Sequence, residues 1–427
     1  MSDSKPATLF SNRNFKLLFG GSTVSALGDQ FTLVALPWLV LKLTGNPAAL
    51  GLVLAAMALP RAAFMLIGGA VVDRMSPRRV LLSARAVNAL CVAILAVLVL
   101  SGGVHMWLVY VLALSIGVST AFAYPAGSAI LPQLVEPGQL RGANSLFMGM
   151  RQLTMVAGPV LAGVVISLGA GGQHALADAR GMGLAFSMDA ISFLFSLASL
   201  AMVRIHSDRH PPRPVGGLLA NVAAGIRNVW SDLPLRAFIL YAAVVSVFVG
   251  GPIQVGLPVL ADTRLDLGAA SLGILMTANA SGIFVGSFLS GVGTRLAHGR
   301  LGLMVLCIDS IAGLTLAALT LVHSTLTGAV LLACVGLLSG SMQIAMYTWI
   351  QQRVPQEMLG RTMSVLLFTF MGLGPVSAAI AGGLLKLISL TALFAGAGFT
   401  LTLIALACMN SRQLRNIGAT QPLANST

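Results

Sequence analysis

Residues 68–79 read Gly-Gly-Ala-Val-Val-Asp-Arg-Met-Ser-Pro-Arg-Arg, a charged stretch in a region where other charges are rare. Two long apolar runs precede this stretch and another follows it. Because about 20 consecutive apolar residues are enough for a helix to cross a bilayer, these runs predict membrane-spanning helices. The stretch itself then predicts the short polar turn at which one span ends and the next begins.

The composition of the 427-residue chain supports the same conclusion. Hydrophobic residues make up 57% of the sequence, charged residues only 9%, and the mean hydropathy is +0.91. Soluble domains carry about 25% charged residues, so the solvent of this protein is the lipid bilayer. In lipid only helices and closed barrels satisfy the backbone. The long continuous runs favour helices over the alternating ten-residue segments of a barrel, and the length allows roughly a dozen spans.

The apolar runs place twelve expected spans in two sets of six. The first set lies near residues 15–41, 48–72, 78–101, 106–131, 143–168 and 182–203, and the second near 236–261, 269–292, 302–322, 326–350, 360–386 and 389–410. This division predicts an N-terminal segment (1–14), a first bundle (15–203), a linker (204–235), a second bundle (236–410) and a C-terminal tail (411–427). Within the linker, Leu218 to Trp230 has the apolar spacing of a helix on a membrane surface; a simple tether is the alternative.

The distribution of basic residues predicts the orientation of the spans. With a cytoplasmic N-terminus, fifteen Lys and Arg residues fall in inner segments, and only Lys42, Arg180, Arg264 and Lys386 fall in outer ones. Membrane proteins concentrate basic residues in their cytoplasmic loops. We therefore expect both termini in the cytoplasm and a multi-pass protein of a prokaryotic plasma (inner) membrane.

The two sets of spans repeat one another. Gly69 recurs as Gly291 (291 − 69 = 222), and Gly158-Pro159 recurs as Gly374-Pro375 (374 − 158 = 216), with two further Leu-Pro and Leu-Gly landmarks at nearly the same offset. A six-helix unit duplicated with both termini inside gives a parallel repeat, in which a substrate site lies near the bilayer midplane between the repeats. The prediction is an all-α membrane protein with two pseudo-symmetric six-helix bundles.

The charged turn also carries a family resemblance. Gly69, Asp73, Arg74, Arg78 and Arg79 resemble the signature loop between helices 2 and 3 of major facilitator superfamily transporters, with Ser76 at a position where glycine is usual. A negative charge at a helix C-terminus is disfavoured by the helix dipole, so Asp73 should seek a positive partner. The resemblance implies that this loop forms a latch that holds the cytoplasmic side closed, and the arginines are either latch members or positive anchors.

A second motif lies in the fifth expected span. Gly158, Pro159 and Gly163 resemble the antiporter motif of drug-exporting major facilitators, although Ser145 and Thr154 replace expected glycines. Small residues allow helices to pack closely in membranes, and proline bends a helix by removing a backbone hydrogen bond. The motif indicates export; plain helix packing is the alternative.

Charges within the spans are the strongest functional signal. Asp29, Arg61 and Arg151 fall inside expected spans 1, 2 and 5, where each charge costs about 2.5–3.5 kcal/mol on the insertion scale. Such groups usually face a cavity and pair with one another. Asp29 either carries a proton or binds a cationic substrate while an arginine modulates it, or it forms a permanent structural pair with Arg61. Both alternatives stay open at this point.

Weaker candidates are polar side chains that could line the cavity. They are Gln254, Asn279, Gln343 and Tyr347 in the second set of spans. Asp189 and Asp309 lie in spans that usually support the cavity in the family's fold, so we expect structural roles for them.

Several longer stretches narrow the resemblance to the branch of macrolide-efflux and enterobactin-exporting proteins. They include Gly28-Asp29, the run from Ala35 to Trp38, Tyr124-Pro125-Ala126, and Leu140-Arg141-Gly142-Ala143-Asn144-Ser145. The resemblance implies a proton-driven exporter of small amphipathic compounds that works by alternating access.

The remaining features bear on other function classes. An uptake permease, a lysolipid flippase, and a non-transporting receptor or assembly partner are the alternatives to an exporter. The sequence has no nucleotide-binding loop of the Walker type, and its scattered basic residues do not form a nucleic-acid-binding face. We expect no enzyme activity, no cofactor, no metal and a monomeric state.

Overall fold

The computed structural model describes residues 9–169, 175–204, 218–296, 300–415 and 417. The secondary structure of these residues is helical, and twelve helices within them are long and apolar enough to cross a membrane. This result confirms the predicted all-helical membrane fold. The chain divides into two compact units: residues 1–218 with 267–277, and residues 219–266 with 278–427.

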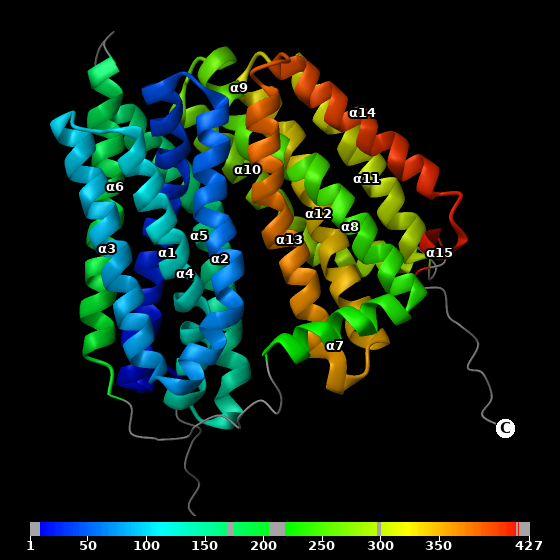
Figure 1. The fold of residues 1–427 in the computed structure, drawn as a ribbon, viewed down its shortest axis with the longest axis horizontal. Coiled ribbons are helices and arrows are strands. Elements are labelled where there is room, and N and C mark those ends of the chain that lie inside the picture. Colours follow the sequence, from blue (N-terminus) through cyan, green and yellow to red (C-terminus); the bar gives the residue numbers. More distant parts are fainter. Residues whose placement is uncertain (1–8, 170–174, 205–217, 297–299, 416, 418–427) are drawn as a thin grey trace, which may run out of the picture. The chain divides into compact units, whose positions relative to one another are not determined.

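The first unit is built from six long helices. They are α1 (Arg13–Thr44), α2 (Pro47–Arg74), α3 (Pro77–Ser101), α4 (Met106–Leu134), α5 (Leu140–Leu168) and α6 (Ala175–Ala201). Helix α1 packs against both α5 and α6, α3 packs against α4 and α6, and α2 packs against α4 (Figure 1). The resulting bundle places α1 next to α5 and α6, the last two of the six helices.

Short polar signals set the helix ends that hydropathy alone cannot locate. The Asn12 side chain accepts hydrogen bonds from the backbone N–H groups of Asn14 and Phe15, which satisfies donors left free at the start of α1. Gly45 ends α1 in a left-handed conformation with φ of 60°, where glycine has no steric penalty. The observed ends lie within four residues of the expected spans except at α6, which begins at Ala175, seven residues before 182.

An apolar cluster packs one end of the first unit's bundle. Phe15, Leu18, Ile130 and Leu200 come from α1, α4 and α6 and are almost completely buried in one apolar cluster. Burial of each such side chain stabilises the fold by about 1.5–3 kcal/mol. This cluster fixes the ends of α1, α4 and α6 relative to one another.

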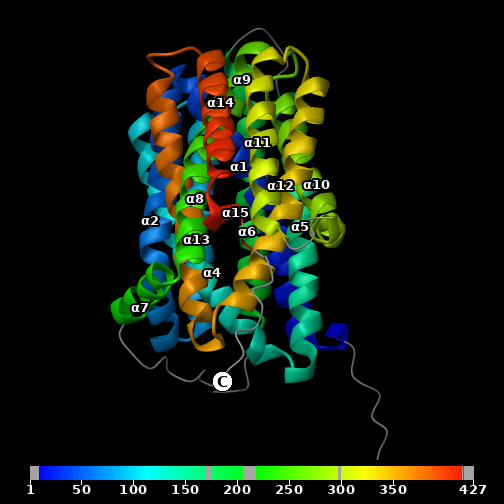
Figure 2. The same ribbon diagram turned by 90° about the vertical axis from the view of Figure 1, so that its right-hand side faces the viewer.

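The remaining helices form six further spans and two additional helices, and all belong to the second unit except Leu218 and the first nine residues of α10, 269–277, which belong to the first. They are α7 (Leu218–Ser231), α8 (Leu233–Gly251), α9 (Leu257–Arg264), α10 (Ala269–Leu296), α11 (Leu301–Ala318), α12 (Thr325–Arg353), α13 (Gln356–Leu384), α14 (Leu390–Cys408) and α15 (Arg412–Arg415). Helices α8 and α9 form one span through a π-helical turn, Pro252–Gly256. Figure 2 shows α11 beside α14, and the short α15 contacts both α8 and α11.

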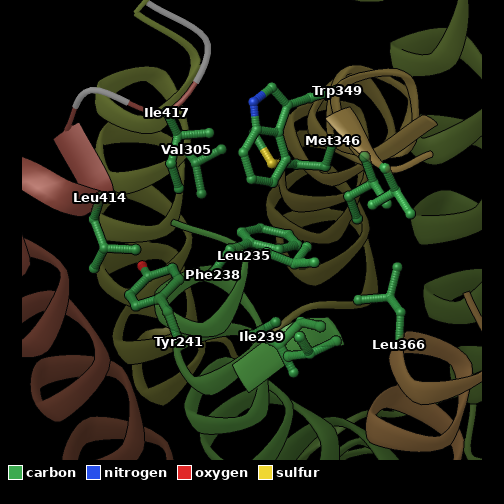
Figure 3. Packing of buried hydrophobic residues seen from close by; sticks show 14 of the residues in the cluster. Leu235, Phe238, Ile239, Tyr241, Val305, Met346, Trp349, Leu366, Leu414 and Ile417 are labelled. Carbon is green, nitrogen blue, oxygen red and sulfur yellow. The ribbon is translucent and has the colours of Figure 1, made fainter. Parts of the chain in front are cut away.

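An apolar core joins α8, α11 and α12 (Figure 3). The rings of Phe238 and Trp349 meet edge to face at 5.8 Å between centroids, and Leu235, Val305 and Met346 pack around them. Aromatic pairs of this geometry contribute about 0.5–1.5 kcal/mol beyond the area they bury. This core holds the ends of these helices as one unit.

Helix α7, expected as a surface helix over residues 218–230, is held against the second unit and crosses α13 at a steep angle (Figure 1). Val229 is fully buried in the apolar core, and the Asn228 amide donates a hydrogen bond of 3.0 Å to Thr362. A Cβ on Gly225 would lie only 2.7 Å from the carbonyl oxygen of Arg361. These contacts show that α7 is a packed element of the second unit.

An ion pair fixes the junction between α7 and α8. Asp232 accepts two hydrogen bonds from the Arg353 guanidinium, at 2.7 and 3.1 Å, and this guanidinium also lies over the Trp349 ring. The other face of α7 leaves Ile226 and Trp230 exposed. Helix α7 therefore buries one apolar side against the rest of the second unit and leaves other apolar side chains exposed.

Candidate functional site

The candidate site of the first unit is centred on the carboxylate of Asp29. Asp29 lies at the middle of the 32-residue α1 and is exposed, whereas Gly28 beside it is buried. The positive charges of Arg61 in α2, Arg85 in α3 and Arg151 in α5 all act on this carboxylate. The three arginines therefore lie within electrostatic range of one carboxylate. The three residues predicted from the sequence are therefore brought together.

The arginines do not form a direct ion pair with Asp29 within the described part of the chain. Arg85 is buried and donates a hydrogen bond of 3.0 Å to the Ser22 hydroxyl of α1. The Arg151 guanidinium lies over the Tyr124 ring of α4, 5.6 Å from its centroid. Asp29 thus interacts with its arginines at longer range, which argues against the permanent Asp29–Arg61 pair considered above.

The sequence prediction missed Arg85. It lies eight residues into α3. In the sequence it follows Arg78 and Arg79 so closely that it looks like a further basic residue of the turn. Eight residues correspond to about 12 Å of helix, which is deep enough for burial. That depth was the signal that could have identified it.

Asp189 of α6 has a different environment from Asp29. It is 1% exposed, accepts a short hydrogen bond from the Thr32 hydroxyl, and accepts a second from Ser192 at 3.2 Å. A Cβ at Gly28 would overlap both Asp189 and Ser192, so glycine is required where α1 meets α6. Buried polar groups are stable when their hydrogen bonds are made. Asp189 fits the structural role expected for it.

The small residues of the α5 motif lie at two close helix contacts. A Cβ on Gly158 would lie 2.3 Å from the Gln30 side chain of α1, and one on Gly163 would lie 3.2 Å from Gly273 in the first turns of α10. Next to Pro159, the backbone N–H of Val160 donates to the Thr277 hydroxyl at 3.1 Å. The motif therefore provides close packing in this unit; its part in export stays a prediction.

The turn between α2 and α3 is described only in part. The surroundings of Gly69 and the side chains of Asp73 and Arg74 lie outside what the structure describes. Arg78 donates to the backbone oxygens of Ala201 and Leu200, at 2.6 and 3.4 Å, at the C-terminus of α6, where a positive charge also complements the helix dipole. Arg79 is exposed. These contacts support an anchoring role for Arg78.

The candidate cavity residues of the second unit are dispersed. Gln254 is exposed on the π-helical turn, a feature that often occurs at functional sites. The Asn279 amide donates to the backbone oxygen of Leu332 at 3.2 Å and so joins α10 to α12. On α12, Gln343 is exposed and Tyr347 packs against the apolar core. Their role as cavity residues stays a prediction.

A buried polar pair in the second unit joins α8 to α11. Tyr241 donates a hydrogen bond of 2.8 Å to the Asp309 carboxylate, and both residues are at most 5% exposed. Because Asp309 has this donor, it fits the structural role expected for it. Among the described residues no group of three or more His, Cys, Asp and Glu side chains is arranged to hold a metal.

Comparison with known proteins places this site in a family context. The model of the Major Facilitator Superfamily matches residues 18–379. The multidrug efflux pump Tap of Mycolicibacterium fortuitum is 27% identical over 410 residues, covering 94% of this chain and 96% of that protein. The enterobactin exporter EntS of Escherichia coli O1:K1 / APEC is 26% identical over 391 residues, covering 91% and 89%.

Solved structures share the fold. A nucleoside transporter has a TM-score of 0.71 at 12% identity, covering 93% of this chain and 99% of that chain. A bacterial homologue of the iron transporter ferroportin, in an inward-facing state, has a TM-score of 0.66 at 19% identity, covering 92% and 98%. At such identities the likeness concerns the fold alone.

Proposed function

Because the chain belongs to the Major Facilitator Superfamily, we propose that this membrane transporter is a proton-coupled exporter of small amphipathic compounds. The named activities of its relatives, multidrug efflux and enterobactin export, support the direction of transport. The proposal includes both termini in the cytoplasm of a bacterial cell, a monomeric state, and two six-helix halves (15–203 and 236–410) joined by the linker 204–235.

The observation that carries the coupling proposal is the isolation of the Asp29 carboxylate. It is exposed at the middle of a span, and the positive charges of Arg61, Arg85 and Arg151 act on it without a direct ion pair to the described residues. A charged group in the membrane costs several kcal/mol unless a cavity or partner stabilises it. A carboxylate that is accessible and not tied to one partner can take up a proton on one side and release it on the other.

Replacing Asp29 with Asn tests this role, because the amide mimics the protonated acid and cannot release a proton. In proteoliposomes with an imposed pH gradient, wild-type protein should move a macrolide, a catecholate siderophore or a cationic dye against its gradient and acidify the lumen as it does so. Asp29→Asn should move the same compound only down its own gradient. Glu136→Gln is the matched control, since Glu136 is an exposed carboxylate in the same unit; it should keep full coupling.

If the Asp29→Asn variant still couples substrate transport to the pH gradient, Asp29 is not the proton carrier. Substrate movement by wild-type protein that ignores the pH gradient would exclude proton coupling altogether.

A further inference from the structure

We propose that the site around Asp29 recognises an anionic amphiphile: a compound with an apolar or aromatic body and one oxyanion group such as a carboxylate or sulfonate. This inference rests on the proposed export function and names the class of substrate. It starts from the charges that the described side chains bring together.

The cluster has an excess of positive charge. Three guanidinium groups, those of Arg61, Arg85 and Arg151, act on the carboxylate of Asp29. Asp189 is the second carboxylate nearby, but its oxygens accept hydrogen bonds from Thr32 and Ser192. With both acids ionised the five groups carry a net charge of +1 (3 − 2), and this becomes +2 when Asp29 takes up a proton. A bound anion would neutralise charge that is costly within a membrane.

Two of the arginines have donors to spare. Arg85 is buried and uses its guanidinium on Ser22. Arg61 is half-buried and Arg151 is exposed, and neither donates a hydrogen bond to another described residue. Both approach the same stretch of α4, because Arg151 lies over the Tyr124 ring and Phe64, one turn from Arg61, meets Phe122. Their like charges therefore repel. A shared anion would convert this repulsion into attraction, because a guanidinium presents a planar fork of donors that matches carboxylate and sulfonate oxygens.

Apolar and aromatic side chains surround the two free guanidinium groups. Met148 and Met155 lie on the same face of α5 as Arg151, one helical turn before and after it, and both are exposed. Phe64 follows Arg61 by one turn of α2 and meets Phe122 of α4 at 6.4 Å between ring centroids. Methionine adapts to varied apolar shapes. The site thus combines an oxyanion receptor with an adaptable apolar wall.

A pair of fluorescent probes isolates the charge. The probe 8-anilinonaphthalene-1-sulfonate is an anion at every working pH, and N-phenyl-1-naphthylamine has the same aromatic body without the sulfonate. Binding is measured by fluorescence titration of wild-type protein in nanodiscs of neutral phosphatidylcholine, with empty nanodiscs subtracted. We expect the sulfonate to bind at least tenfold more tightly than the neutral amine. Equal affinities, or tighter binding of the amine, would overturn the proposal without any variant.

Arginine variants locate the preference. Arg151→Gln and Arg61→Gln should each weaken sulfonate binding by about tenfold and leave binding of the neutral probe unchanged, while Arg151→Lys retains part of the preference. Arg141→Gln, an exposed arginine at the start of the same helix α5, is the control and should change neither probe. If the glutamine variants lose both probes equally, or keep the preference, the assignment of these arginines is wrong.

Transport assays separate this inference from the function on which it rests. In proteoliposomes with a pH gradient, wild-type protein should move the sulfonate faster than the neutral amine. Gradient-driven movement of the amine or of a cationic dye, with no movement of the sulfonate, would refute the anion site and leave the exporter proposal intact. Movement of no probe and no macrolide or siderophore would refute the proposed function itself.

Discussion

Replacing Gly117 with alanine tests how closely α2 and α4 cross beside the site. A Cβ built on Gly117 would lie 1.9 Å from the backbone oxygen of Met57, which precedes Arg61 by one turn of α2. Close Cβ contacts start near 3.4 Å, so the two helices would have to separate by about 1.5 Å (3.4 − 1.9). Overpacking of this kind costs about 1–3 kcal/mol, whereas alanine in place of glycine stabilises a helix interior by about 0.5–1 kcal/mol.

Gly127 of the same helix provides the matched control. A Cβ there meets nothing within 4 Å, so Gly127→Ala receives the helix-forming gain of about 0.5–1 kcal/mol without the clash. The gain cancels between the two variants, and Gly117→Ala should be less stable than Gly127→Ala by about 1–3 kcal/mol. Unfolding of each purified variant in mixed dodecylmaltoside and SDS micelles, followed by tryptophan fluorescence, measures this difference.

The same substitution should also disturb the site. Because Arg61 lies one turn from Met57, separation of α2 from α4 moves its guanidinium away from Arg151, and Gly117→Ala should lose part of the preference for the sulfonate probe. Equal stabilities of the two alanine variants, together with an unchanged probe preference, would show that the crossing is looser than the structure indicates and does not position Arg61.

Two predictions concern the second unit. Asp232 is the N-cap of α8 and accepts a hydrogen bond from the backbone N–H of Leu235. Asparagine can still cap the helix, so Asp232→Asn should lose only the partly exposed ion pair with Arg353, about 0.5–1 kcal/mol of unfolding free energy, while Asp232→Ala should lose about 1 kcal/mol more. SDS titration of both variants measures the two losses, and equal losses would contradict the capping role. Tyr241→Phe removes the hydrogen-bond donor to buried Asp309 and should destabilise the protein by about 1–3 kcal/mol when that carboxylate is ionised. The destabilisation should be smaller at low pH, because a protonated acid needs no donor. Unfolding of both proteins at two pH values measures this change, and a destabilisation that grows on acidification would contradict the reasoning.

The spans could be predicted from the sequence because hydropathy reports the solvent of each segment directly. Helix ends are determined by polar capping residues outside the apolar runs, and a hydropathy pattern does not detect such residues. Asn12 and Gly45 extend α1 beyond 15–41 in this way. Ala175, where α6 begins, precedes the expected start of its span because its first turns are helical without being strongly apolar.

Part of the candidate site could be predicted for a similar reason. Asp29, Arg61 and Arg151 stand out because charges are rare within apolar runs, and that rarity is visible in one dimension. Arg85 does not stand out, since its burial depends on α3 packing so that the guanidinium reaches Ser22 of α1. The contact between the Arg151 guanidinium and the Tyr124 ring likewise depends on how closely α4 approaches α5. Tertiary packing supplies both facts.

The carboxylates within the spans differ in their partners, and this difference distinguishes the proposed proton carrier from the structural carboxylates. Asp189 and Asp309 are buried and each accepts a hydrogen bond from a hydroxyl group, so a change in their protonation would alter a helix contact. Asp29 is exposed, and the more distant charges of arginines act on it without a direct ion pair to the described residues. Its protonation can therefore change without unpacking the bundle.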